Sequence, residues 1–417
     1  MKKFLKTIEK KQFSINIFYL LNALFFVHLG FIGAIYIVFF YNFGISKLHT
    51  NMLSSIFAIT VFLFEIPSGA YSDLFGTRKS LLLSGGLLVL SMTLFAFGNN
   101  LWVFALAQGF WGISFAFESG ALDAWMVNNS QSKGTQLDNT FARARKINNL
   151  LSILAGFIGG LLSNFSLRWP WLLSVITSIS YLALVYIFVN KEEKYVTDSE
   201  SAISFKQGLE SIKLITKNSI EYCLINPVVK TIIIFNLIIS FSFSPIFVYW
   251  SPYLNGLFNK GIWILGWIWV MIKFSNFIGN AILEHLLKTN NNRYKIMRTS
   301  VACISIVVVT ASLYKNFIVV LLMFILFEIF IEILQPLQSA LINDWIPDGE
   351  RATILSFNSM ACRASNFLSL MVMGYLGDKV SMSFTWSLSG IIIMSNFAVI
   401  AYLKAKEIRH ANIKKQN

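Results

Sequence analysis

The chain consists mainly of apolar segments that are long enough to cross a lipid bilayer as helices. Only 13% of its 417 residues are charged, whereas a soluble domain carries about 25%. A spanning helix needs about 20 apolar residues. The sequence therefore predicts an all-α membrane protein and excludes soluble enzymes and nucleic-acid binders. Twelve segments can be marked off at charged and turn-forming residues: 16–41, 50–71, 80–98, 101–127, 141–164, 169–189, 228–255, 261–287, 296–314, 317–343, 353–377 and 383–403.

The positive charges indicate how these segments cross the membrane. The formal net charge is +14, from 34 Lys and Arg against 20 Asp and Glu. When the N-terminus is placed inside, 27 of the 34 cations fall on the cytoplasmic side, five fall outside and two lie within spans. Because Lys and Arg accumulate in cytoplasmic loops, we expect both termini in the cytoplasm of a multi-pass protein in the plasma or inner membrane. Topology explains the basic balance without a nucleic-acid partner.

A long polar segment divides the predicted spans into two groups of six. We expect an N-terminal half, 1–189, a cytoplasmic central loop, 190–227, and a C-terminal half, 228–417. Similar motifs recur in corresponding spans of the halves, at offsets of 220 and 217 residues, which indicates a parallel internal repeat. The matched motifs are Ser119–Trp125 with Ser339–Trp345, and Lys146–Ser152 with Arg363–Ser369.

The loop between the second and third spans carries the most recognisable motif. Glycines that allow a sharp turn alternate there with an acid and two cations: Gly69, Asp73, Gly76, Arg78 and Lys79. This pattern resembles the cytoplasmic gate motif of the major facilitator superfamily. The resemblance implies two six-helix halves that rock about a midplane site, giving alternating access within one chain, so we expect a monomer.

Other positions depart from that family's patterns. Leu74 and Thr77 stand where the loop motif usually has basic residues, and Ala105 replaces an Arg that the family places before Gln108-Gly109. A signature associated with exporters keeps two glycines near residue 160 but lacks its proline. The resemblance therefore implies a transporter and leaves export or import open.

Charged residues within spans are candidates for function because each costs about 2.5–3.5 kcal/mol to insert. Glu328 and Glu332 are four residues apart, so they share a helix face near the middle of their span. Glu118 lies in the corresponding span of the first half, and Lys273 lies near the middle of the eighth span. Carboxylates in a low-dielectric site can exchange protons near neutral pH. We expect these acids to couple proton entry to substrate movement, with His28 in the first span as a further candidate.

Each candidate has an alternative structural interpretation. Glu328 or Glu332 could instead pair with Lys273 or Arg363 to fix helix packing, and His28 could be a buried packing residue. Charged residues toward span ends are better read as a network on the cytoplasmic side: Glu65, Asp123, Asp344, Arg351 and Arg363.

Aromatic residues of the seventh span form a weaker candidate for the substrate cavity. Phe243, Phe247, Tyr249 and Trp250 suit apolar or cationic organic molecules through surface burial and cation–π attraction. Alternatively, these rings serve packing or mark the membrane interface.

No nucleotide-binding loop, metal-ligand cluster or nucleophile arrangement is found, so we expect no cofactor, no metal and no enzymatic activity. The function predicted is secondary transport across a lipid bilayer, with proton-coupled efflux of a small drug or metabolite favoured. The alternatives are a nutrient symporter for a sugar or peptide and, in another class, a non-transporting receptor or membrane-embedded enzyme.

Overall fold

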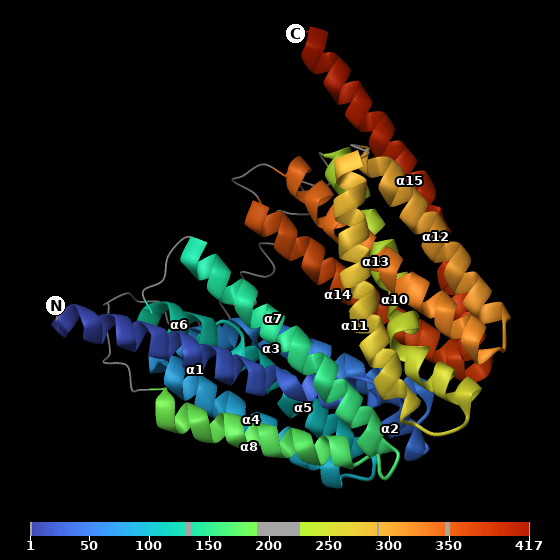
Figure 1. The fold of residues 1–417 in the computed structure, drawn as a ribbon. Coiled ribbons are helices and arrows are strands. Elements are labelled where there is room, and N and C mark those ends of the chain that lie inside the picture. Colours follow the sequence, from blue (N-terminus) through green and yellow to red (C-terminus); the bar gives the residue numbers. More distant parts are fainter. Residues whose placement is uncertain (1, 131–134, 190–225, 290–291, 347–350, 417) are drawn as a thin grey trace. The chain divides into compact units, whose positions relative to one another are not determined.

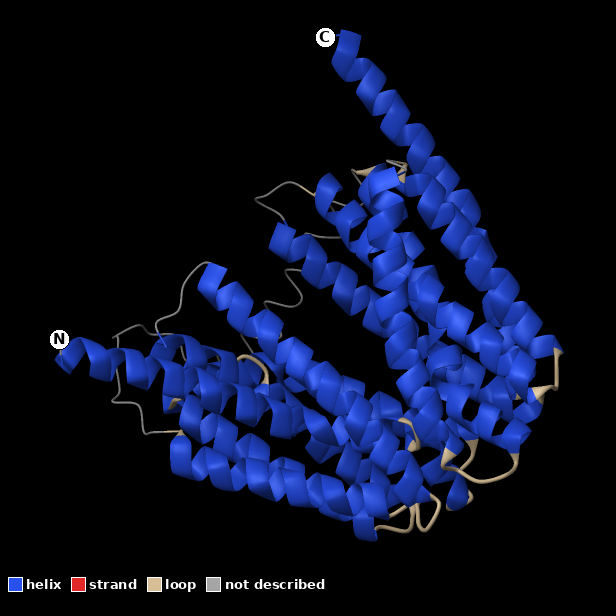
Figure 2. Ribbon diagram, viewed as in Figure 1, coloured by secondary structure: helices blue, strands red, loops and turns tan. Residues whose placement is uncertain are grey.

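The computed structural model describes residues 2–130, 135–189, 226–289, 292–346 and 351–416 (Figure 1). Within them all regular structure is α-helix and no strand occurs (Figure 2). Most of the expected central loop, residues 190–225, lies outside the described residues. The helices are α1 (Lys2–Gly33), α2 (Tyr36–Asn42), α3 (Lys47–Phe75), α4 (Thr77–Phe97), α5 (Leu101–Glu118), α6 (Ala121–Ser130), α7 (Thr135–Ser163), α8 (Trp169–Phe188), α10 (Pro227–Phe258), α11 (Ile264–Thr289), α12 (Arg293–Leu313), α13 (Phe317–Trp345), α14 (Arg351–Lys379) and α15 (Met382–Gln416).

Ten stretches of the described helices are long and apolar enough to cross a membrane. Helices α11 and α14 cover the other two predicted spans and have 26 and 29 residues. That length suffices for a crossing of about 20 residues, but neither helix is among the ten. The count of twelve membrane spans therefore remains a prediction.

Two predicted spans are broken in the structure. The segment expected at 16–41 separates into α1 and α2, and the segment expected at 101–127 separates into α5 and α6. At the second break Gly120 adopts φ +80°, a left-handed conformation that glycine enters without steric cost. The apolar pattern runs through both breaks, so hydropathy alone did not reveal them.

The helices form two compact units. Unit 1 contains α1, α2, α4 to α8 and residues 53–75 of α3, together with Gly261–Val270. Unit 2 contains α10, α12 to α15 and the remainder of α11, together with Ser46–Met52 at the start of α3.

Hydroxyl side chains hold neighbouring helices together in unit 1. Helix α4 packs against α5 and α8, and α1 packs against α7 and α8. Along the α4–α5 contact, Ser80 donates a hydrogen bond to the carbonyl oxygen of Phe117 at 2.8 Å, and Ser91 donates to that of Ala107 at 2.8 Å. Small hydroxyl residues of this kind allow close helix approach in a membrane and bond across it.

In unit 2 a side-chain hydrogen bond also joins two helices, at a position that corresponds to one in unit 1 by the internal repeat. Ser365 on α14 donates to the carbonyl oxygen of Leu237 on α10 at 2.9 Å. Its counterpart at an offset of 217 is Asn148 on α7, which donates to the side-chain oxygen of Asn22 on α1 at 2.6 Å. Both halves thus tie their fifth predicted span to their first through one polar position.

Large apolar side chains remain exposed on the outside of the helices. Trp102 on α5 is 78% exposed and Ile306 on α12 is 63% exposed. Extended apolar surface of this kind is rare on soluble monomers and suits contact with lipid.

Candidate functional site

The predicted acids of the tenth span lie in a polar cluster within unit 2. Glu328 on α13 is only 5% exposed, and Glu332 lies one turn further and is half-buried. Lys273 on α11 interacts electrostatically with both carboxylates. Arg363, the other cation considered as a partner, is exposed and forms no ion pair with a described residue. The structure therefore brings together Lys273, Glu328 and Glu332.

A close approach of α11 to α13 positions this cluster. A Cβ atom at Gly279 would lie 2.6 Å from the carbonyl oxygen of Ile329 and 2.7 Å from Cβ of Glu332, so only glycine fits. One turn of helix is thereby brought close enough for Asn280 to donate a hydrogen bond from Nδ2 to Oε2 of Glu332, at 3.1 Å. The sequence reasoning missed Asn280, although its spacing of seven residues from Lys273 places the two on one helix face.

The aromatic candidates of α10 differ in their surroundings. Phe243 and Phe247 contact Phe327, the neighbour of Glu328, with ring centroids 5.6 and 5.9 Å away. Trp250 stacks on Phe324 and is 6% exposed. Of the four predicted residues, only Phe247 keeps an exposed ring, at 43%.

Tyr249, the fourth aromatic candidate, is fully buried and hydrogen-bonded. Its hydroxyl accepts from Nδ2 of Asn51 at 3.0 Å and donates to the carbonyl oxygen of Met373 at 3.2 Å. The same Asn51 amide also donates to the carbonyl oxygen of Leu370 at 2.7 Å. These bonds tie Tyr249 to the beginning of α3 and to α14.

Glu118 occupies the break between α5 and α6 in unit 1. It is the last residue of α5 and is 6% exposed. Its carboxyl group interacts electrostatically with Asp123 on α6 and with the buried Tyr181 on α8. The left-handed Gly120 turns the chain two residues after Glu118. A buried acid thus stands where the backbone leaves its helical path.

His28 is buried in an aromatic environment on α1. The ring is 1% exposed, and it meets Phe25 and Trp111 edge to face, with centroids 6.0 and 5.6 Å away. Nearby on the same unit, Gln108 donates a hydrogen bond to the hydroxyl of Tyr36. These surroundings favour the packing interpretation of His28, while its role in proton transfer stays a prediction.

The predicted gate motif connects the end of α3 to the start of α4. Gly76 has φ +87° and precedes the first residue of α4. Arg78 donates to the carbonyl oxygen of Tyr186 at 2.9 Å and lies over that ring, while Lys79 lies over the ring of Phe75. Asp73 is exposed and has no ion pair among the described residues of unit 1. Gly69 has open space beside its Cα.

The residues expected to form a cytoplasmic network differ in their surroundings. Asp344, at the end of α13, forms an ion pair with Arg293 at the start of α12, a partner that sequence reasoning missed. Asp123 interacts electrostatically with Arg145 on α7. Glu65 is exposed, and Arg351 begins α14.

A second polar cluster was not anticipated from the sequence. Asp378, at the end of α14, accepts hydrogen bonds from the backbone N–H groups of Lys47 and Leu48 at 2.9 and 3.0 Å. Its carboxylate also lies 3.7 Å from the ammonium group of Lys47. The acid therefore caps the first turn of α3 within unit 2. Only the position of Asp378 directly after a predicted span could have suggested such a role.

A family profile described as Major Facilitator Superfamily matches residues 18–337 and 291–417. The chain belongs to the Major Facilitator Superfamily. Among individual proteins, it is 24% identical over 411 residues to the uncharacterized MFS-type transporter YxaM of Bacillus subtilis (strain 168), which covers 96% of this chain and 98% of that one. Membership makes the protein a multi-pass transporter of the cell membrane and not an enzyme.

Solved structures of other transporters share the fold at low sequence identity. A mutant of the nucleoside transporter NupG matches with a TM-score of 0.76 and 12% identity, covering 94% of this chain and 99% of that one. A POT family transporter in complex with 5-aminolevulinic acid matches with a TM-score of 0.70 and 13% identity, covering 94% and 96%. At such identities the likeness establishes the fold alone.

Proposed function

We propose that this major facilitator protein is a proton-coupled exporter of small organic compounds. It acts as a monomer by alternating access, with its termini and most of its positive charge in the cytoplasm. The observation that carries the proposal is the cluster of Glu328, Glu332 and Lys273, in which a carboxylate only 5% exposed interacts electrostatically with an ammonium group and a second carboxylate.

The cluster suggests how a proton and a substrate could compete. When Glu328 binds a proton, Lys273 is left with Glu332 as its carboxylate partner. When both acids are ionised, they can attract a cationic group of the substrate. Because a charge inside the bilayer costs several kcal/mol, these two arrangements exclude each other energetically. Alternation between them would couple proton entry to substrate exit.

Glu118 supplies the corresponding acid of the first half. Like Glu328, it is almost fully buried on a helix that the superfamily places around the substrate path. Because Glu118 lies at a helix break, the backbone around it can rearrange. We therefore propose Glu118 as the second proton-carrying residue.

The two glycines that α7 shares with the exporter signature are the reason for proposing export, and close packing explains why both positions are glycine. A Cβ atom at Gly159 would collide with the backbone of Phe31, and one at Gly160 with the backbone of Gly266. These positions keep two glycines of the exporter signature described above. The alternative is uptake of a nutrient by symport. Measuring the direction of transport distinguishes it from export.

The first test is accumulation of a panel of fluorescent organic cations in cells with and without the protein. Export predicts lower accumulation in cells that contain the protein, and addition of a proton uncoupler should abolish the difference. Higher accumulation in those cells would establish uptake and overturn export.

The second test uses purified protein in liposomes that contain a pH-sensitive dye. A cation found in the panel should drive proton movement in the wild type, and Glu118→Gln, Glu328→Gln and Glu332→Gln should each lose it. Glu284→Gln is the matched control, since this acid lies on α11 with a side chain 70% exposed and pairs with Lys288. Full proton movement in all three Gln variants would refute proton coupling through these acids.

A further inference from the structure

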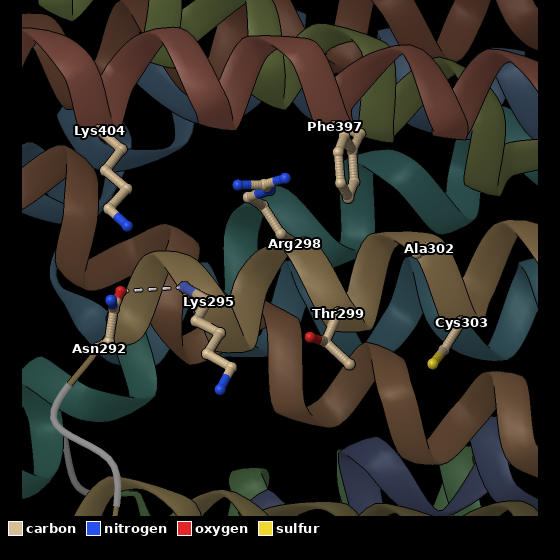
Figure 3. Close-up of a pocket in the computed structure, with 8 residues that line it drawn as sticks. All are labelled: Asn292, Lys295, Arg298, Thr299, Ala302, Cys303, Phe397 and Lys404. Carbon is tan, nitrogen blue, oxygen red and sulfur yellow. Dashed lines mark hydrogen bonds between the residues drawn. The ribbon is translucent and has the colours of Figure 1, made fainter.

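A basic pocket of about 480 Å³ lies between α12 and α15, away from the acids of the proposed transport site. Its size is within the range of about 300–1,000 Å³ that is typical of small-ligand sites. Three cations, two polar side chains and three apolar ones line it: Lys295, Arg298, Lys404, Asn292, Thr299, Ala302, Cys303 and Phe397 (Figure 3).

The residues that line the pocket include three cations and no acid. No Asp or Glu occurs between Glu284 and Glu328, and the nearest acid to Lys404 in the sequence is Glu407. Among the described side chains, none of the three lining cations forms an ion pair. This distinguishes them from Arg293, which is paired with Asp344 on the neighbouring helix. The net positive charge of the residues that line the pocket favours an anionic ligand.

Arg298 is held in place at the centre of the pocket. Its guanidinium group lies over the ring of Phe397 with a centroid distance of 4.2 Å. In Figure 3 the two side chains reach toward each other from α12 and α15, and Lys404 extends into the same space, whereas Lys295 points away from α15. A stacked guanidinium keeps its N–H edge available for two parallel bonds to a phosphate.

The N-terminal end of α12 adds to the positive electrostatic potential of the lining cations. Asn292 precedes the helix and accepts a hydrogen bond from the backbone N–H of Lys295 at 3.1 Å. One end of the pocket therefore lies at the N-terminus of a helix of 21 residues, where the helix dipole favours an anion within the first turn. The charges of the lining cations and the dipole at the N-terminus of α12 therefore both favour an anion at this end of the pocket.

An apolar surface continues from the basic end of the pocket. At 3.6 residues per turn, residues 298, 302, 306 and 313 advance along one side of α12. Beyond Ala302, this side presents Ile306 at 63% exposure and Leu313 at 71%. A ligand that fills the whole surface has an anionic head and a long apolar tail.

We propose that the pocket between α12 and α15 binds an anionic phospholipid. The phosphate contacts Arg298 and Lys404, with Lys295 at the rim, and an acyl chain follows α12 past Ala302 and Ile306. The distribution of Lys and Arg places this end of the helices in the cytoplasmic leaflet, where anionic lipids attract basic segments. The site is separate from the acids proposed to move protons.

The test is native mass spectrometry of the purified full chain, titrated with phosphatidylglycerol or with phosphatidylcholine of the same acyl chains. The wild type should bind phosphatidylglycerol more tightly. Each cation removed near a membrane surface should weaken binding about fivefold. The Arg298→Gln/Lys404→Gln variant should therefore bind on the order of 25-fold more weakly.

The control variant Lys315→Gln/Lys379→Gln removes the same charge at exposed positions outside the pocket and should bind phosphatidylglycerol as the wild type does. If the double pocket variant fails to fold, Lys404→Gln alone should still show the fivefold loss. Equal affinity for both lipids, or unchanged binding by the pocket variants, would overturn the proposal. Displacement of the lipid by inorganic phosphate at equal concentration would also overturn it and indicate a site for soluble anions.

Discussion

Asn280 on α11 donates a hydrogen bond from Nδ2 to Oε2 of Glu332 on α13 across 3.1 Å. The Asn280→Ala substitution removes this donor and leaves a half-buried carboxylate with one partner fewer. The loss of a typical hydrogen bond costs about 0.5–1.5 kcal/mol. We therefore expect a lower melting temperature for the purified protein, measured by thermal unfolding in detergent.

Asn343→Ala provides the matched control for that measurement. Asn343 lies on α13 as well and is half-buried, but its amide bonds to the carbonyl oxygen of Ser339 within its own helix. Its substitution should change the melting temperature little. Equal effects of the two substitutions would show that the bond to Glu332 contributes nothing specific.

The stability of the protein should depend on pH through Asp378. Burial by itself raises the pKa of this carboxyl, but hydrogen bonds from the backbone N–H groups of Leu48 and Lys47 and the charge of Lys47 hold it below its ordinary value. A lowered pKa in the folded state stabilises the protein above the unfolded pKa of about 3.9, and this stabilisation is lost as the pH falls through the folded pKa.

Asp378→Asn should therefore lower the melting temperature at pH 7 and reduce its dependence on pH. Loss of a helix-capping acid costs about 0.5–2 kcal/mol. Thermal unfolding of both proteins between pH 7 and the acid limit of folding measures this, and their curves should converge toward low pH. A constant offset at every pH would contradict a role for the ionised carboxylate.

Hydropathy and charge predicted the all-helical fold because long apolar segments have one stable solution in a bilayer. They did not predict where helices break. The ends of α1 and α5 lie inside apolar runs, and only Gly120 marks the second break in the sequence. Breaks of this kind depend on packing against neighbouring helices, which a one-dimensional pattern does not contain.

The candidate site was also predictable only in part, because the sequence shows which residues are charged but not which residues meet. Glu118, Glu328 and Lys273 stand out because charge is rare inside apolar segments, and two of them meet in one cluster. Asn280 carries no charge and does not stand out among the many asparagines of the chain. The partner of Asp344, Arg293, lies on another helix. Such pairings follow from tertiary contacts and not from spacing.

Close packing at Gly160 gives a steric prediction. A Cβ atom there would overlap the backbone of Gly266, so Gly160→Ala should lower stability by about 1–3 kcal/mol through overpacking. Gly86→Ala is the control, since nothing lies within 4 Å of a Cβ at Gly86 on α4. An alanine in that open helical position should be neutral or stabilising by about 0.5–1 kcal/mol. Matching melting temperatures of the two variants would refute the close approach.

The helix break beside Glu118 gives a prediction that separates backbone strain from crowding. A Cβ at Gly120 meets nothing within 4 Å, but its φ of +80° disfavours any other residue. Gly120→Ala should therefore cost about 1–2 kcal/mol and slow proton movement in liposomes, because relaxing the strain shifts Glu118. Gly109→Ala on α5 also enters open space, with an ordinary φ, and should leave transport unchanged. Equal transport by both variants would show that the left-handed turn does not position Glu118.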